Sequence, residues 1–293
     1  MRKIILILFV CITSLNYFSY VSAKMYKSGT IFEKEIKFTK NFVLPLSDGK
    51  WEVINSYNFF YYFPFKGNSI IRLENNEALE FIWVERANLS GESMGFIDSA
   101  VNEITFKDKY DGCYQRPEYY LVKVYKKGGT HNCLVIAHIE TNKEIFTPDD
   151  PLDNNPELKK YIKEKSIILP PIMLASKHSY FSRLNRGEWF VIRYFANPKI
   201  FKSPKLNYLT EESSEFHKAN ISRFPEHKKA MDKWISFSAK RHQHLEKLFN
   251  AKEYHLLNLN KYILENDIDN LSNQGKKKNI TEDLEKLNEL YKS

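Results

Sequence analysis

The fold class is clearest in the sequence EYYLVKVYKKGGTHNCLVIAHI, from Glu118 to Ile139. Its runs EYYLVKVY and NCLVIAHI are rich in apolar and β-branched residues, and they flank a turn, KGGT, that contains two adjacent glycines. Two such runs around a glycine turn are typical of an antiparallel β-hairpin. The natural register of this hairpin places Cys133 opposite Val124. The sequence therefore predicts antiparallel pairing here, with Cys133 inside a strand.

Segments on both sides of this hairpin are also predicted to be β-strands. Trp51–Phe63 and Ala78–Glu85 are rich in β-branched and aromatic residues, which favours strands. A second hairpin is predicted for Ser176–Arg183 and Trp189–Phe195, joined by the turn signal Asn-Arg-Gly. We expect an antiparallel sheet from Ile31 to about Glu140, continued by this second hairpin.

Two segments have helical character. Asn155, followed by Pro156 at the first helical position, predicts a short charged helix ending near Lys165. From Pro225 to Phe249 the apolar residues fall on one helical stripe. We expect Trp234 to dock this longer helix on the sheet. The stripe consists of Met231, Trp234, Ile235, Ser238, Leu245, Leu248 and Phe249.

These patterns predict an α+β protein in which a long C-terminal amphipathic helix covers an antiparallel β-sheet built from hairpins. We expect residues 24–250 to form a single domain. Residues 251–293 are expected to be a charged, partly helical tail, because the run SNQGKKKN reads as a linker and a weak amphipathic pattern follows it.

Residues 1–23 are typical of a secretory signal peptide. Arg2 and Lys3 precede an apolar run from Ile4 to Ile12, and small residues lead to Ala23. An apolar core of about nine residues is roughly half of what crosses a bilayer. We expect cleavage after Ala23 and an exported protein, periplasmic in a Gram-negative bacterium and secreted otherwise. Later apolar segments are too short for an integral helical membrane protein.

Composition and charge narrow the ligand classes. Hydrophobic residues make up 43% of the chain, which excludes disorder for most of it. The net charge is +8, and it is +6 after removal of Arg2 and Lys3. In an exported protein this charge favours lipid headgroups, a glycan or another envelope protein over nucleic acid. No phosphate-binding loop or dinucleotide fingerprint is present, so we expect no cofactor.

Two cysteines remain after cleavage, Cys113 and Cys133. In an oxidising compartment they most simply form one disulfide. A redox pair or half of a metal site is the alternative, but the wide spacing is not the C-x-x-C arrangement. The hairpin register requires Cys113 to reach Cys133 from outside the Val124 pair.

The histidines do not form a metal motif. His131 and His138 are seven apart on one predicted strand and so face opposite sides. His242 and His244 are two apart on a helix, which turns them about 200° from each other. We therefore predict no metal site, with ligands from distant segments as the open alternative.

One segment, Gly91–Gly95, fits the G-x-S-x-G pattern of a serine nucleophile. Ser93 would be the nucleophile, and Asp153 and His178 follow in the expected order. However, Asn88–Ser90 breaks the preceding strand, and no glycine-rich oxyanion segment precedes the motif. The preferred interpretation is a polar turn between two strands.

Two other groups have a structural and a functional interpretation. Asp149, Asp150 and Asp153 lie in a proline-bounded loop, which favours a plain turn over paired catalytic carboxylates. The aromatic run from Tyr57 to Phe65 could stack sugars or apolar ligands. Core packing is the simpler explanation of that run.

The order of several phrases resembles a loosely defined group of exported proteobacterial proteins of unknown function. The phrases are LPLSDGKWEVI from Leu44, the cysteine Cys113, HNCLVIAHI from His131 and the stretch 169–198, followed by the helix containing Trp234. The resemblance implies a periplasmic β-rich protein and brings no known catalytic residues. The segment around Ser93 looks like strand–turn–strand in such proteins, and the charged tail after Asn250 departs from their pattern.

We expect an exported envelope protein with a non-enzymatic role. Its aromatic and basic surface would bind another envelope protein, lipid headgroups or a glycan. The alternative is a serine hydrolase that uses Ser93 with His178.

Overall fold

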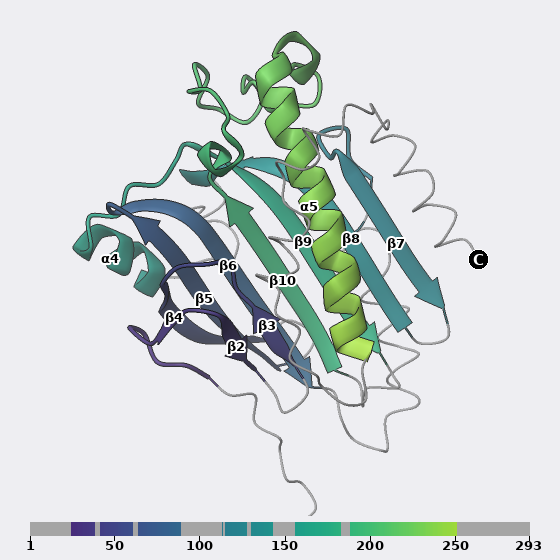
Figure 1. Ribbon diagram of the computed structural model, residues 1–293. Helices are drawn as coiled ribbons and strands as arrows, with labels where there is room; N and C mark the ends of the chain where they lie inside the picture. Colours follow the sequence, from purple (N-terminus) through teal and green to yellow (C-terminus); the bar gives the residue numbers. More distant parts are fainter. Residues whose placement is uncertain are drawn as a thin grey trace, which may run out of the picture.

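The computed structural model describes residues 25–38, 42–60, 64–88, 113, 115–127, 130–142, 156–182 and 188–250 (Figure 1). Residues 1–23, which are predicted to be a signal peptide, lie outside the described residues, as do Ser93 and the acidic loop from Asp149 to Asp153. The tail from residue 251 onward also lies outside them.

A large antiparallel sheet forms the body of the described chain, which confirms the α+β class with an antiparallel sheet. Its strand order is β1-β4-β5-β6-β10-β9-β8-β7, and β2 and β3 pair separately (Figure 1). The strands are β1 (Ile31–Phe32), β2 (Glu35–Lys37), β3 (Val43–Pro45), β4 (Trp51–Phe60), β5 (Pro64–Glu74), β6 (Glu77–Asn88), β7 (Leu121–Lys127), β8 (Thr130–Glu140), β9 (Ile172–Ser182) and β10 (Glu188–Ala196).

Both predicted hairpins are present, and the register of the first is confirmed. In the pairing of β7 with β8, Val124 lies opposite Cys133. The second hairpin, β9–β10, is inserted between β6 and β8, so that it lies at the centre of the sheet and does not extend it. This position suits its sequence, because Trp189–Phe195 is apolar on both faces and must be covered on both.

The strand β5 is absent from the sequence expectations. It begins with Pro64 and includes Lys66, Gly67 and Asn68, residues that disfavour strands in isolation. In the structure β5 pairs along its length with β4 on one side and β6 on the other. Pairing with two neighbours outweighs the weak local preference.

A β-bulge changes the direction of side chains in β4. The register shifts between Val53 and Asn55, where Val53 pairs with Ile70 and Asn55 pairs with Ser69. Regular alternation would leave Val53 and Asn55 on the same face. The extra residue at the bulge moves Asn55 to the other face.

The described helices lie on both sides of the sheet. α4 (Pro156–Glu164) begins at the predicted proline, and α5 (Pro225–Asn250) runs across β8 and β9 (Figure 1). Short 3₁₀ segments, η2 (Pro198–Phe201) and η3 (Ile221–Arg223), lie between β10 and α5. We call the sheet face that contacts α5 the helix face and the other the opposite face.

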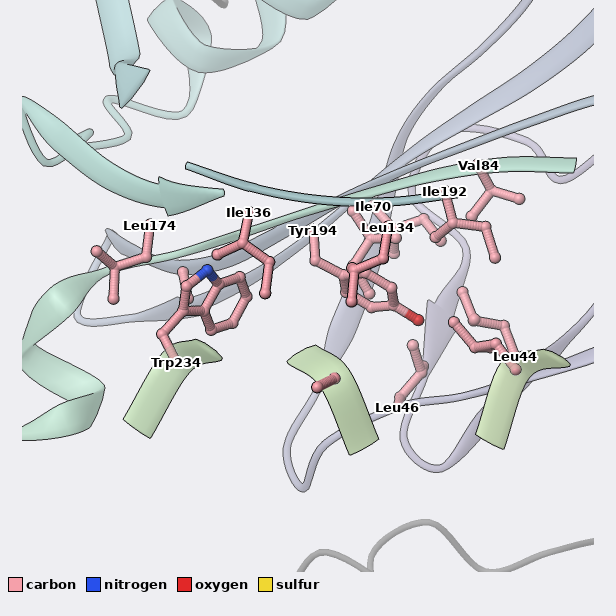
Figure 2. Close-up of a cluster of buried hydrophobic side chains, with 14 of the residues drawn as sticks. Leu44, Leu46, Ile70, Val84, Leu134, Ile136, Leu174, Ile192, Tyr194 and Trp234 are labelled. Atoms are coloured by element: carbon pink, nitrogen blue, oxygen red, sulfur yellow. The ribbon is translucent and has the colours of Figure 1, made fainter. Parts of the chain in front are cut away.

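The larger part of the core lies between the helix face, α5 and the β2–β3 pair. Figure 2 shows strand side chains, among them Ile136 and Leu174, directed toward Trp234 of α5. Leu44 belongs to the same buried cluster and meets it from β3. The Trp234 indole is fully buried, and its Nε1 donates a hydrogen bond to the Ala175 carbonyl at 3.1 Å.

A second core lies on the opposite face. Leu158 and Ile162 of α4 pack there against Phe81, Trp83 and Phe195 of the sheet. Cys113, Cys133 and Val135 form a smaller apolar cluster near β7. The central strands are therefore covered on both faces. Within the described residues, no helix has the combined length and hydropathy needed to cross a membrane.

Replacing Trp234 with phenylalanine tests how α5 is held. Trp234→Phe keeps an aromatic ring but removes the bond to Ala175 and leaves a gap in a packed core. We expect the free energy of unfolding to fall by about 2 kcal/mol in urea titrations. Lys229→Ala, at an exposed position of α5, should leave it within about 0.5 kcal/mol of the parent. Equal stability of Trp234→Phe and the parent would contradict this packing.

Candidate functional site

The opposite face carries a line of polar and aromatic side chains across five adjacent strands. Register pairs Asn55 with Ser69, Ser69 with Trp83, Trp83 with Arg193, and Arg193 with Lys177. Paired residues place their side chains on the same face. We call these five residues the polar row. Asn55 belongs to it only because of the β4 bulge.

Part of the polar row is buried without internal hydrogen bonds. Asn55, Ser69 and Trp83 are all buried. Within the described structure, Asn55 Nδ2, Ser69 Oγ and Trp83 Nε1 have no hydrogen-bond partner. Buried polar atoms are nearly always paired, and an unpaired one costs about 1 to 3 kcal/mol. Because three of them lie on adjacent strands of one face, we take the polar row as the candidate site.

A charged pair lies beside the polar row. Arg193 Nη1 donates to Glu85 Oε2 at 2.6 Å, and the two side chains are 28% and 10% exposed. The guanidinium carbon of Arg193 also lies 5.9 Å from the centre of the Trp83 ring. Phe195 meets the edge of that ring, with 5.2 Å between ring centres. These contacts hold the guanidinium in place while leaving part of it exposed.

Gly67 allows Tyr57 to complete this arrangement. The two residues are cross-strand partners on β4 and β5. A Cβ on Gly67 would lie 2.3 Å from Cζ of the Tyr57 ring, so the ring occupies the space of the missing side chain. From there Tyr57 Oη donates to Glu85 Oε1 at 3.1 Å. Both oxygens of Glu85 thus have partners before any ligand arrives.

The site is rich in hydrogen-bond donors. Asn55 Nδ2, Ser69 Oγ and Trp83 Nε1 can all donate, while Arg193 and Lys177 are cationic donors. Glu85 is already engaged by Tyr57 and Arg193. This chemistry suits a ligand with several acceptor oxygens and a negative charge.

The structure places His178, the expected partner of Ser93, on the helix face. It is fully buried between β9 and α5. Its Nε2 lies 3.0 Å from Ser176 Oγ, and its Nδ1 lies 3.1 Å from His242 Nδ1. Both ring nitrogens therefore have partners inside the protein, and the ring has no exposed surface with which to meet a substrate.

The partners assign protons along this chain. Asn132 Oδ1 accepts, so His242 Nε2 carries a proton and donates to it. His242 Nδ1 is then an acceptor, with Tyr180 Oη at 2.7 Å and His178 Nδ1 at 3.1 Å from it. Tyr180 Oη also lies 2.9 Å from the His242 carbonyl oxygen, and His178 Nε2 lies 3.0 Å from the Ser176 hydroxyl. Both imidazoles are neutral in this arrangement.

Burial favours the same neutral state. Burial, and secondarily the positive charge of Lys123, lowers the pKa of His242 to about 3. Burial also holds the pKa of His178 well below its ordinary value, with contributions from His242 and Arg241. This buried histidine network links β8, β9 and α5, and its role is to hold these elements together.

The two cysteines come together as expected. The structure joins Cys113 and Cys133 as a disulfide, with their Cα atoms 6.1 Å apart. Cys133 lies on the opposite face of β8, two residues after His131. His131 Nε2 lies 3.9 Å from Cys113 Sγ. His138 faces the other way, with its Nε2 2.9 Å from the Glu211 carbonyl oxygen.

Sequence reasoning missed most of these groupings. The polar row depends on the bulge and on the central position of β10, and neither leaves a local signal. Two signals were available: the alternation Ser176, His178, Tyr180 on one strand, and His131 with Cys133 two residues apart. Each places the members of its group on one face.

No family model and no curated protein sequence matches the chain. Among solved structures, it is similar to a transcriptional regulator of the GntR family from Enterococcus faecalis. The TM-score is 0.24 and the identity 9%, over 50% of this chain and 91% of the regulator.

Replacing Gly67 with alanine should displace Tyr57. We expect Gly67→Ala to lower the free energy of unfolding by about 2 kcal/mol, because the new methyl group collides with the ring. Urea titration measures the change. In the double variant Tyr57→Ala, Gly67→Ala the collision is gone, so it should match Tyr57→Ala alone. A fully additive pair of effects would contradict the contact.

The buried histidine network predicts acid destabilisation. An unfolded histidine binds a proton near its ordinary pKa of 6.5, whereas folded His242 does so only near 3. Because the unfolded chain then holds more protons, stability is complete above pH 6.5 and falls as pH drops toward 3. The His242→Gln variant should be less stable than the parent at neutral pH. Below pH 6.5, however, its free energy of unfolding should fall less steeply than that of the parent, by up to about 1.4 kcal/mol per pH unit, as unfolding titrations can measure. An unchanged pH slope in that variant would contradict the assignment; His217→Gln, outside the network, is the control.

Proposed function

We propose that the protein is an exported, non-enzymatic binding protein and that the polar row is its ligand site. The observation that carries this proposal is the set of three buried polar atoms without partners, on Asn55, Ser69 and Trp83. They lie beside the fixed guanidinium of Arg193. A site that pre-positions unsatisfied donors next to a cation is organised for a ligand.

The donors specify the ligand chemistry. Three neutral donors and two cationic ones require acceptor oxygens and favour an anion. A carboxylate would meet Arg193 and Lys177, while hydroxyl or ring oxygens would meet Asn55, Ser69 and Trp83. This combination is the chemistry of an acidic sugar, so of the expected ligand classes we favour a carboxylate-bearing glycan.

The burial of the polar row favours a glycan over lipid headgroups and over another envelope protein. Ser69 and Trp83 lie below the surface, with exposed fractions of 0% and 6%. A headgroup that remains in a bilayer, or a flat protein surface, cannot reach such atoms. We therefore favour a small ligand, such as one sugar residue or chain end, which would meet the partly exposed Arg193 first.

Several parts of the proposal come from the sequence. The typical signal-peptide features of residues 1–23 support export, to the periplasm in a Gram-negative bacterium. The buried stripe on α5 supports the role of an amphipathic cover for the helix face, whereas the proposed binding row lies on the opposite face, next to the core under α4. No described contact supports a serine nucleophile paired with His178, whose nitrogens are engaged within the core.

The variant Ser69→Ala tests the proposed role of the Ser69 hydroxyl, because its effects on ligand affinity and on stability are expected to have opposite signs. We expect this variant to bind digalacturonate about tenfold more weakly by calorimetry, because it removes one donor to the ligand. Its own stability should stay equal or rise by up to about 1 kcal/mol, because a buried unpaired hydroxyl disappears. Arg193→Gln should weaken binding further, whereas Arg223→Gln, at an exposed position, should not.

Neutral digalactose is the matched ligand, since it lacks the carboxylates, and it should bind weakly. Absence of digalacturonate binding to the folded parent protein would contradict the acidic-sugar assignment. A less stable Ser69→Ala with unchanged affinity would mean that the hydroxyl has a structural partner, such as a buried water. Equal binding to vesicles containing anionic phospholipid would favour the headgroup class.

A further inference from the structure

Cys113, Cys133 and His131 form a cluster of three residue types that bind metal ions, a capability separate from the disulfide and from the polar row. One ligand atom from each residue, two sulfurs and one imidazole nitrogen, lies within 4.8 Å of the others. All three side chains are buried. We infer that the reduced form of this chain binds Zn(II) through Cys113 Sγ, Cys133 Sγ and His131 Nε2, and that metal binding and disulfide formation exclude each other.

The backbone pre-positions two of the three ligands. His131 and Cys133 are alternate residues of β8, a strand paired on both sides, so both side chains leave on the opposite face. Cys113 approaches from outside the hairpin and lies 3.9 Å from His131 Nε2. Ligand atoms of a tetrahedral zinc ion lie roughly 3.6 Å apart. The separation between Cys113 Sγ and His131 Nε2 is close to that value, and reduction frees the two sulfurs to move apart.

The negative charge of two thiolates favours a divalent cation between Cys113, Cys133 and His131. The surroundings of the two sulfurs are apolar, with Val135, Tyr119 and Val122 packed against them. Two buried thiolates alone would be costly in such surroundings. Two thiolates, one neutral imidazole and Zn(II) together carry no net charge. Thiolate and imidazole are also the ligands that zinc prefers in proteins.

The two states interconvert by a balanced reaction. Reduction of the Cys113–Cys133 bond takes two electrons and two protons from a cellular thiol pair, which becomes a disulfide, and yields two thiols. Zn(II) then displaces both thiol protons and forms two Zn–S bonds, while His131 Nε2 contributes its lone pair. In the reverse direction a second disulfide accepts two electrons from the two thiolates and two protons from solvent, becomes a thiol pair, and leaves the Cys113–Cys133 bond reformed and Zn(II) released.

The test uses the full mature chain, reduced with a phosphine, desalted without oxygen and titrated with Co(II) as a spectroscopic probe for zinc. We expect one equivalent of Co(II) to produce thiolate-to-metal absorption, and Zn(II) to displace it. The oxidised chain should bind neither ion. His131→Gln should bind about tenfold more weakly or worse with an altered spectrum. His138→Gln is the matched control on the other face of β8 and should behave as the parent.

Folding is followed by circular dichroism in the same samples. If reduction unfolds the chain, one equivalent of Zn(II) must restore the fold, because metal binding then stabilises it. Failure of zinc to restore it overturns the proposal. Absence of thiolate-to-Co(II) absorption in the reduced folded chain also overturns it. So does a His131→Gln variant with the affinity and spectrum of the parent, because two thiols alone would then account for the binding.

Discussion

β10 pairs with β6 on one side and with β9 on the other, and this pairing sets the register of the central sheet. It fixes the face that each central side chain reaches: His178 points to α5, and Lys177 next to it points to the opposite face. Because the central strands are covered on both faces, a slip of one residue would exchange the two sets. The core, the histidine network and the polar row are therefore consequences of one register.

Buried polar side chains are arranged differently at two places in the sheet. In the histidine network, Ser176, His178 and His242 bond to one another and to Asn132 Oδ1, although Asn132 Nδ2 has no partner in the described structure. In the polar row, the donor atoms of Asn55, Ser69 and Trp83 have no partner there and do not bond to one another. This difference is the reason that binding is proposed for the polar row and not for the histidine network.

Local patterns in the sequence predict the hairpins well. The register of Val124 with Cys133 follows from the glycine turn, and the starts of α4 and α5 follow from Pro156 and Pro225. The central position of β9–β10 and the β4 bulge could not be predicted, because both depend on contacts between distant segments. Polar alternation at Ser176 and His178 normally indicates a solvated face, yet both side chains are buried and His178 contacts His242 of α5. The candidate site was missed because the polar row depends on the bulge and on the central position of β10.

The contact between Tyr57 and Gly67 ties two positions on neighbouring strands to one another. The aromatic ring on β4 fits only where β5 has no side chain, and without the ring Glu85 loses one of its two partners. In descendants of this sequence, a side chain at 67 is compatible only with the loss of the tyrosine at 57, whereas loss of the tyrosine leaves Gly67 in place. Substitutions at 67 should therefore follow substitutions at 57 over evolutionary time.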